Sequence, residues 1–196
     1  MRLVVISCAL LALAACQKGK EAQQPIQENG QTAENATSTA GEVKGVDRGH
    51  AGMPAPDVSF KDPDGEETSL AEFAGKPVLV NLWATWCAPC VKELPTLDRL
   101  KGAQGKNGLQ VVAISQDNAP HASVVAFLDA HKIENLDAYQ DENMDLSAKA
   151  GAEVLPTSIL FDARGREIWR YVGDLDWTSP EAVKLLSESG SAAKGN

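Results

Sequence analysis

Residues 78–95 read VLVNLWATWCAPCVKELP and contain the strongest indication of the fold. Residues 78–83 form a nearly continuous apolar run, which is typical of a parallel strand covered on both faces. Apolar residues then recur at helical spacing, which predicts a helix over 88–101. The Cys87–Cys90 pair therefore lies where a buried strand ends and a helix begins.

Outward from this stretch, strand patterns alternate with helix patterns along the chain. The apolar runs predict strands at 58–60, 66–70, 109–115, 136–139, 158–162 and 167–172, and helices at 123–131, 144–150 and 179–187. Turn residues join the first two and the last two of these strands as hairpins. We expect an α/β fold in which helices flank a mixed central sheet, with an N-terminal β-hairpin extension.

The two cysteines have the spacing of a redox-active disulfide. Positions i and i+3 of a first helical turn lie on one face, close enough for the two sulfurs to join. Free N–H groups at the helix N-terminus stabilise a thiolate on Cys87, which makes Cys87 the expected nucleophile. Cys90, one turn inside, is the expected resolving thiol. Pro89 falls in the first turn, where the lack of an N–H costs nothing, and Pro95 should kink the helix.

A zinc site and a purely structural disulfide both account less well for the cysteine pair. A zinc site needs about four ligands, and the sequence has no second cysteine pair and three scattered histidines. A structural disulfide would close a loop too short to restrict the unfolded chain much. We therefore expect neither a metal nor an organic cofactor, and we assign the Cys87–Cys90 pair to redox chemistry.

The first 52 residues differ in composition from the rest of the chain. Residues 1–15 combine a basic Arg2 with a short apolar run and small residues, as in a secretory signal peptide. The four residues 13–16 resemble the lipobox of bacterial lipoproteins, in which the cysteine, here Cys16, is lipidated. Residues 16–52 are polar without apolar periodicity, which predicts a lipidated cysteine followed by a flexible tether.

We assign the folded domain to residues 53–190 and a disordered tail to 191–196. The formal net charge of −9 argues against nucleic acid as a partner, because phosphate binding needs basic patches. Attachment to a membrane would then depend on the lipid on Cys16. Gln17 after that cysteine resembles the pattern that sorts lipoproteins to the outer membrane. We take a monomer as the expected state.

Residues 81–90, NLWATWCAPC, followed by Glu93-Leu94-Pro95, resemble the TlpA/ResA branch of the thioredoxin superfamily, with its redoxin or AhpC/TSA-like domain. The resemblance spans about residues 54–187. It implies a thioredoxin fold and thiol:disulfide oxidoreductase activity. Members of this branch carry a Glu three residues after the second cysteine, and Glu93 matches that position. Glu93 is therefore the candidate for tuning the thiol pKa values and for proton exchange with Cys90.

The resemblance also implies a substrate-binding region. In the family, a proline with a cis peptide bond lies opposite the CxxC motif and presents backbone to the substrate, and Pro156, preceded by Leu155, matches it. Trp86 is the third candidate for substrate contact. Thioredoxins carry a buried Asp where this sequence has Asn81, so a carboxylate is missing from that position.

The expected function is reduction of protein disulfides outside the cytoplasm, at the periplasmic side of a membrane. The resemblance implies a membrane electron donor of the DsbD or CcdA kind, and cytochrome c maturation and general repair of protein thiols are both open as pathways. An oxidase or isomerase of the DsbA type is the alternative direction. A thiol peroxidase would need Pro and Thr where Val80 and Ala84 stand, and a copper-delivery protein would use CxxxC.

Overall fold

The computed structural model describes residues 44–104 and 108–191. The predicted signal peptide, Cys16, the tether up to residue 43 and the tail from 192 lie outside the described residues. Within the described part of the chain, no helix combines the length and the apolar character needed to cross a membrane.

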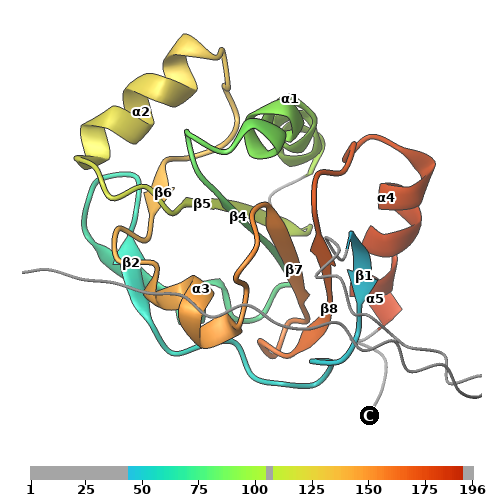
Figure 1. The fold of residues 1–196 in the computed structure, drawn as a ribbon. Coiled ribbons are helices and arrows are strands. Elements are labelled where there is room, and N and C mark those ends of the chain that lie inside the picture. Colours follow the sequence, from blue (N-terminus) through green and yellow to red (C-terminus); the bar gives the residue numbers. More distant parts are fainter. Residues whose placement is uncertain (1–43, 105–107, 192–196) are drawn as a thin grey trace, which may run out of the picture. The chain divides into compact units, whose positions relative to one another are not determined.

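The centre of the fold is three long strands of one eight-stranded sheet. Strand β4 (Val78–Trp83) pairs in parallel with β5 (Gln110–Ser115) and antiparallel with β7 (Thr157–Phe161). Every residue of β4 is buried, which confirms the prediction of a strand covered on both faces. Figure 1 shows these strands crossing the middle of the domain.

Further strands extend the sheet on both sides, in the order β1-β8-β7-β4-β5-β6-β2-β3. These further strands are β1 (Gly45–Asp47), β2 (Ser59–Lys61), β3 (Glu67–Ser69), β6 (Tyr139–Gln140) and β8 (Glu167–Val172). Pairing is parallel between β5 and β6 and antiparallel between β7 and β8, so the sheet is mixed, as predicted.

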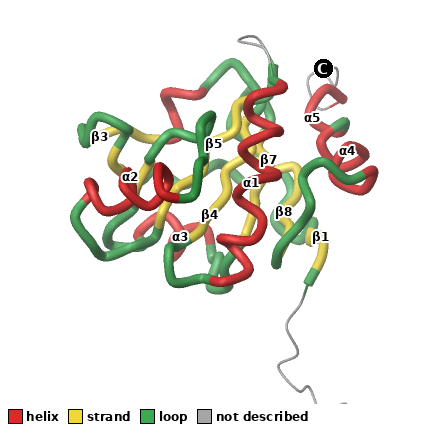
Figure 2. Tube along the Cα trace, turned by 90° about the horizontal axis from the view of Figure 1, so that it is seen from above, coloured by secondary structure: helices red, strands yellow, loops and turns green. Residues whose placement is uncertain are grey.

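Helices cover both faces of the sheet, as Figures 1 and 2 show. They are η1 (Leu70–Phe73, a short 3-10 helix), α1 (Ala88–Ala103), α2 (His121–Ala130), α3 (Asp145–Ala150), α4 (Pro180–Leu186) and α5 (Glu188–Ser191). Alternate residues of β4 supply the two cores. Leu79 and Trp83 pack with α1, α2 and α4, whereas Val80 and Leu82 pack with α3 and the β2–β3 hairpin.

A buried ion pair connects β8 to α3. The guanidinium of Arg170 donates two hydrogen bonds of 2.8 Å to the two carboxylate oxygens of Glu167. Its third nitrogen donates to the backbone oxygen of Ala150, at the end of α3, at 2.8 Å. Both charged side chains are almost fully buried, so each depends on the other for its stability.

One part of the predicted tether is wrong. Residues 44–52 belong to the folded unit, because Gly45–Asp47 forms strand β1 against β8, with Val46 opposite Tyr171. The backbone N–H of Gly52 also donates to the oxygen of Glu167 at 2.7 Å. This strand is held by backbone pairing at a sheet edge, which a three-residue Gly-Val-Asp segment does not reveal in its hydrophobic pattern.

The remaining elements agree with the sequence analysis to within a few residues. The clearest difference is β6, for which the sequence predicts residues 136–139 and which begins only at Tyr139. Leu136 and Ala138 are buried, but they lie in the connection before the strand. Their burial accounts for the strand-like apolar pattern. Helix α1 continues through Pro95, and α5 extends the fold to Ser191.

Candidate active site

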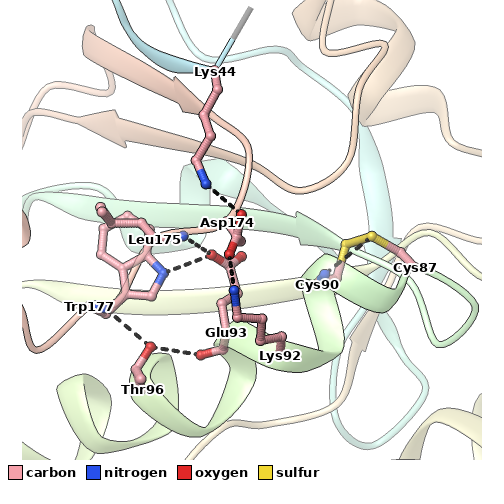
Figure 3. Close-up of polar contacts among 9 residues, drawn as sticks. All are labelled: Lys44, Cys87, Cys90, Lys92, Glu93, Thr96, Asp174, Leu175 and Trp177. Atoms are coloured by element: carbon pink, nitrogen blue, oxygen red, sulfur yellow. Dashed lines mark hydrogen bonds and ion pairs between the residues drawn. A yellow bond between two sulfur atoms is a disulfide. The ribbon is translucent and has the colours of Figure 1, made fainter. Parts of the chain in front are cut away.

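The two cysteines lie at the junction of β4 and α1 and form a disulfide, with their Cα atoms 5.2 Å apart. Cys87 is the N-cap of α1, and its sulfur accepts a 3.3 Å hydrogen bond from the backbone N–H of Cys90. Figure 3 shows both sulfurs at the start of the helix. Cys90 is completely buried, whereas 6% of Cys87 remains exposed.

This geometry favours a thiolate on Cys87 when the disulfide is reduced. An N–H group of the first turn already points at its sulfur, and the positive end of the helix dipole lies there. Because Cys90 is shielded from solvent, a partner in solution would reach the sulfur of Cys87 first. The arrangement can therefore carry out thiol–disulfide exchange in two ordered steps.

Glu93 lies one helical turn beyond Cys90 and is buried, with 3% of its surface exposed. Its Oε1 accepts a 2.8 Å hydrogen bond from the side-chain amide of Asn81 on β4. Its Oε2 accepts from the backbone N–H of Leu175 at 2.9 Å and from the indole N–H of Trp177 at 3.3 Å (Figure 3).

Burial raises the pKa of Glu93 to about 7 from an ordinary value of 4.5, because desolvation disfavours the charged carboxylate. The hydrogen bonds from Leu175, Asn81 and Trp177 oppose this effect, and the charge of Asp174 adds to it. A carboxyl group that titrates near neutrality can take up or release a proton during thiol exchange. Glu93 thus combines burial with a pKa near neutrality.

Asn81 connects the strands and the helix around the site through hydrogen bonds. Its amide nitrogen also donates to the hydroxyl of Ser158 on β7, at 2.9 Å, so Asn81 links β4 to both α1 and β7. Asn81 is fully buried. It supplies a hydrogen-bond donor to the carboxylate on α1.

Asp117 holds the backbone just before the cysteines, and sequence reasoning missed it. Its two carboxylate oxygens accept from the backbone N–H of Thr85 at 2.9 Å and from the Thr85 hydroxyl at 2.7 Å. The hydroxyl of Ser115 donates to the same carboxylate at 2.6 Å. The signal available in the sequence was an acidic residue two positions after a buried strand, at the same sheet edge as the CxxC motif.

Two of the three predicted substrate-contact residues, Trp86 and Leu155, line a groove beside the CxxC motif, whereas Pro156 is buried and is not part of its lining. Trp86 is 68% exposed, and it lines a groove of about 520 Å³ together with Leu155, Met144 and residues of α3. The peptide bond between Leu155 and Pro156 is cis. The groove thus brings together Trp86 and Leu155, which lie far apart in the sequence.

The two prolines predicted to be structural both lie in α1. Pro89 is in its first turn, and Pro95 is inside it. For residues 44–104 and 108–191, no group of three or more His, Cys, Asp or Glu side chains is arranged to hold a metal ion.

Comparison with known proteins agrees with this geometry. The Redoxin family model matches residues 50–186. The thiol-disulfide oxidoreductase ResA of Halalkalibacterium halodurans is 30% identical over 125 residues, which cover 64% of this chain and 70% of ResA.

Two solved structures share the fold. A Chlorobium tepidum protein provisionally named thiol:disulfide interchange protein DsbE is 27% identical, with a TM-score of 0.60, over 74% of this chain and 98% of that one. StoA from Bacillus subtilis is 24% identical, with a TM-score of 0.56, over 68% of this chain and 99% of StoA. The expected thioredoxin-like fold, a mixed sheet flanked by helices, is confirmed. The chain belongs to the Redoxin family and is a thiol:disulfide oxidoreductase of the ResA and DsbE type.

Proposed function

We propose that this oxidoreductase reduces disulfides of partner proteins outside the cytoplasm. The observation that carries the proposal is the position of Cys87 at the N-cap of α1, next to the fully buried Cys90. In the reduced enzyme the Cys87 thiolate attacks one sulfur of a substrate disulfide, and the other substrate sulfur leaves as a thiolate. The product of this step is a mixed disulfide between enzyme and substrate.

Cys90 completes the reaction. Its thiolate attacks the sulfur of Cys87, which forms the Cys87–Cys90 disulfide and releases the second substrate thiol. Two electrons thus pass from the enzyme dithiol to the substrate disulfide. In this scheme Glu93, buried one helical turn after Cys90 on α1 and with a pKa of about 7, accepts the proton of the Cys90 thiol and returns it when the enzyme is reduced again.

The groove beside the disulfide is the proposed contact surface for the substrate chain. Trp86 and Leu155 offer apolar surface next to Cys87, and Met144 is exposed at the same groove. A polypeptide with apolar residues near its disulfide fits this surface better than a small polar disulfide does. The reaction as proposed needs no metal and no organic cofactor.

The location follows from the N-terminal sequence. The proposal places the enzyme on a membrane through a lipid on Cys16, facing the periplasm, with Gln17 as the sorting signal for the outer membrane. A reductase in an oxidising compartment needs electrons, so a membrane donor of the DsbD or CcdA kind would reduce its disulfide. Protein disulfides that must be reduced during cytochrome c maturation are the proposed substrates.

Trapping of the mixed disulfide tests the order of attack. A Cys90→Ser enzyme should accumulate covalent adducts with a disulfide-containing protein, and a Cys87→Ser enzyme should not, because only the first retains the attacking thiol. Equal trapping by both variants would contradict the assigned roles.

Palmitate labelling of the wild-type chain in a bacterial host, compared with a Cys16→Ser chain, tests the proposed lipid anchor.

The reduction potential tests the direction of electron flow. Equilibration against glutathione and dithiothreitol buffers should give a value near that of thioredoxin, about −270 mV. A value near that of DsbA, about −120 mV, would instead make the enzyme an oxidant of protein thiols.

A further inference from the structure

The segment from Gly173 to Trp177 connects separate parts of the active site. Its first residue, Gly173, donates its backbone N–H to the oxygen of Pro156 at 2.9 Å. Leu175 and Trp177, from the same segment, supply both hydrogen bonds to Oε2 of Glu93. The segment therefore contacts the groove side of the site at one end and the buried carboxyl group at the other.

Asp174 lies between these contacts and is held by two ion pairs. Its Oδ1 is 2.7 Å from Nζ of Lys44, and its Oδ2 is 2.9 Å from Nζ of Lys92 (Figure 3). Lys92 precedes Glu93 on α1, and Lys44 immediately precedes β1. These ion pairs lower the pKa of Asp174 to about 2, with the hydrogen bond from Lys44 as the largest cause. Asp174 is therefore ionised throughout the range in which thiols exchange.

The backbone conformation of Gly173 leaves room for the side chain of Lys44, which pairs with Asp174. Its φ of +94° lies in the region that favours glycine. A Cβ atom at this position would lie 3.0 Å from Cγ and 3.3 Å from Cδ of Lys44. The stem of Lys44 thus passes directly over Gly173 on its way to Asp174, so the ion pair and the turn fit together.

We propose that Asp174 is a positioning residue of the enzyme: its ion pairs with Lys44 and Lys92 hold the Gly173–Trp177 segment against α1, so that the donors of this segment meet the carboxylate of Glu93. The inference rests on the proposed role of Glu93 in proton exchange. Asp174 does not contact the sulfur atoms in this scheme, and it acts through the two hydrogen bonds to Oε2.

The charged groups near Glu93 determine whether its pKa rises or falls when Asp174 is replaced. The charge of Asp174 itself raises the pKa of Glu93, but it is the smallest of the causes, behind the hydrogen bond from Leu175. Lys92 is largely exposed and paired with Asp174. Burial raises the pKa of Tyr171 on β8, and the charges of Glu181, Asp174 and Glu93 add to this effect, so its hydroxyl stays neutral. Weakening the two donors should therefore raise the pKa of Glu93.

The first test measures that pKa directly. Carboxyl ¹³C NMR follows the titration of Glu93 in the disulfide form, in which neither cysteine titrates. Asp174→Asn should move the midpoint upward by about half a pH unit or more. Asp176→Asn is the matched control, because Asp176 lies in the same segment and its carboxylate accepts hydrogen bonds from Thr178 and not from Lys44 or Lys92. An unchanged or lower midpoint in the Asp174 variant, or an equal shift in the control, overturns the proposal.

The second test asks whether Asp174 acts through Glu93. The pH profile of iodoacetamide reaction with the reduced enzyme should change with Asp174→Asn in the wild-type background and stay unchanged by it in the Glu93→Gln background. An equal change in both backgrounds would mean a direct effect on the thiols and would overturn the inference. If Glu93→Gln alone leaves the profile unaltered, the proposed role of Glu93 fails as well, and the two failures are thus distinguished.

Two further variants test the need for the charge of Asp174 and provide an alternative if Asp174→Asn does not fold. Asp174→Glu retains the charge and should restore the profile in large part. If Asp174→Asn does not fold, Lys44→Gln combined with Lys92→Gln removes the same ion pairs through side chains that are mostly exposed. That double variant should raise the Glu93 midpoint as well, in part through the unpaired charge of Asp174, and an unchanged midpoint contradicts the proposal.

Discussion

Asn81 and Glu93 are twelve residues apart in the sequence and are joined by a buried 2.8 Å hydrogen bond between an amide nitrogen and a carboxylate oxygen. The bond connects the central strand to the helix that carries the cysteines. With Leu175 and Trp177, Asn81 replaces the water that a carboxylate would otherwise bind. These three donors favour the charged carboxylate and burial disfavours it, and a pH titration can measure the balance between the two effects.

Stability should depend on pH through Glu93. Its pKa is about 7 in the folded protein and about 4.5 in the unfolded chain, so the folded protein binds this proton more tightly and protonation stabilises the fold. This contribution is fully present below pH 4.5 and is lost as pH rises through 7, by about 3 kcal/mol. Urea unfolding of the disulfide form at several pH values should show this fall in the wild type. Glu93→Gln should abolish it, and an equal fall in that variant would contradict the assignment.

Replacing Asn81 should destabilise the protein most at alkaline pH. Asn81→Leu removes a donor from the Glu93 carboxylate, which costs about 1–3 kcal/mol when the carboxylate is charged and less when it is protonated. The free energy of unfolding at pH 8 and at pH 5 gives the comparison. Ser158→Ala is the control, because it removes the other partner of the Asn81 amide and leaves the bond to Glu93 in place. A loss independent of pH would argue against the coupling.

Asp117 should restrain the backbone before the cysteines. Asp117→Asn weakens the hydrogen bonds to the N–H and the hydroxyl of Thr85, and we expect a loss of about 1–3 kcal/mol in stability. The Thr85 amide should also exchange with deuterium faster, and reduction of the disulfide should change in rate. Hydrogen exchange by NMR measures the first effect. Unchanged protection of the Thr85 amide would show that the contact is not needed.

The buried pair of Arg170 and Glu167 should be sensitive to the loss of one partner. Glu167→Gln leaves the guanidinium buried without a counter-charge, which should cost about 3–5 kcal/mol. Replacing both residues together, with Arg170→Met and Glu167→Leu, should cost clearly less. Thermal or urea unfolding of the three proteins completes the comparison, and a double variant as unstable as the single one would contradict this reasoning.

The sequence predicted the elements whose apolar pattern is regular. Strand β4, the start of α1 and the disulfide pair follow directly from the spacing of residues between 78 and 101. Glu93 was recognised through a family resemblance, and its burial could not be inferred from α1 alone. The donors that surround it come from Leu175 and Trp177, in an irregular segment without periodicity, more than 80 positions away.

Contacts made by single polar residues were the hardest to predict. Asp117 and Thr85 are 32 positions apart, and the ion pair of Lys44 with Asp174 spans 130 positions. Neither belongs to a repeating pattern, because such contacts depend on which strand ends meet at one sheet edge. The family resemblance covers the cysteines and Glu93 and says nothing of these supports.

Strand β1 also affects how readily the sheet can pair with another chain, independently of thiol chemistry. It covers the outer backbone groups of β8 along Arg170–Val172, near the end of the sheet. An uncovered strand edge is a template for pairing with another chain, and a protein shortened to begin at residue 50 would expose one here. Residues 45–47 thus protect the molecule from edge-to-edge association with its own copies, and a three-residue strand with an acidic end offers a poor edge in its place.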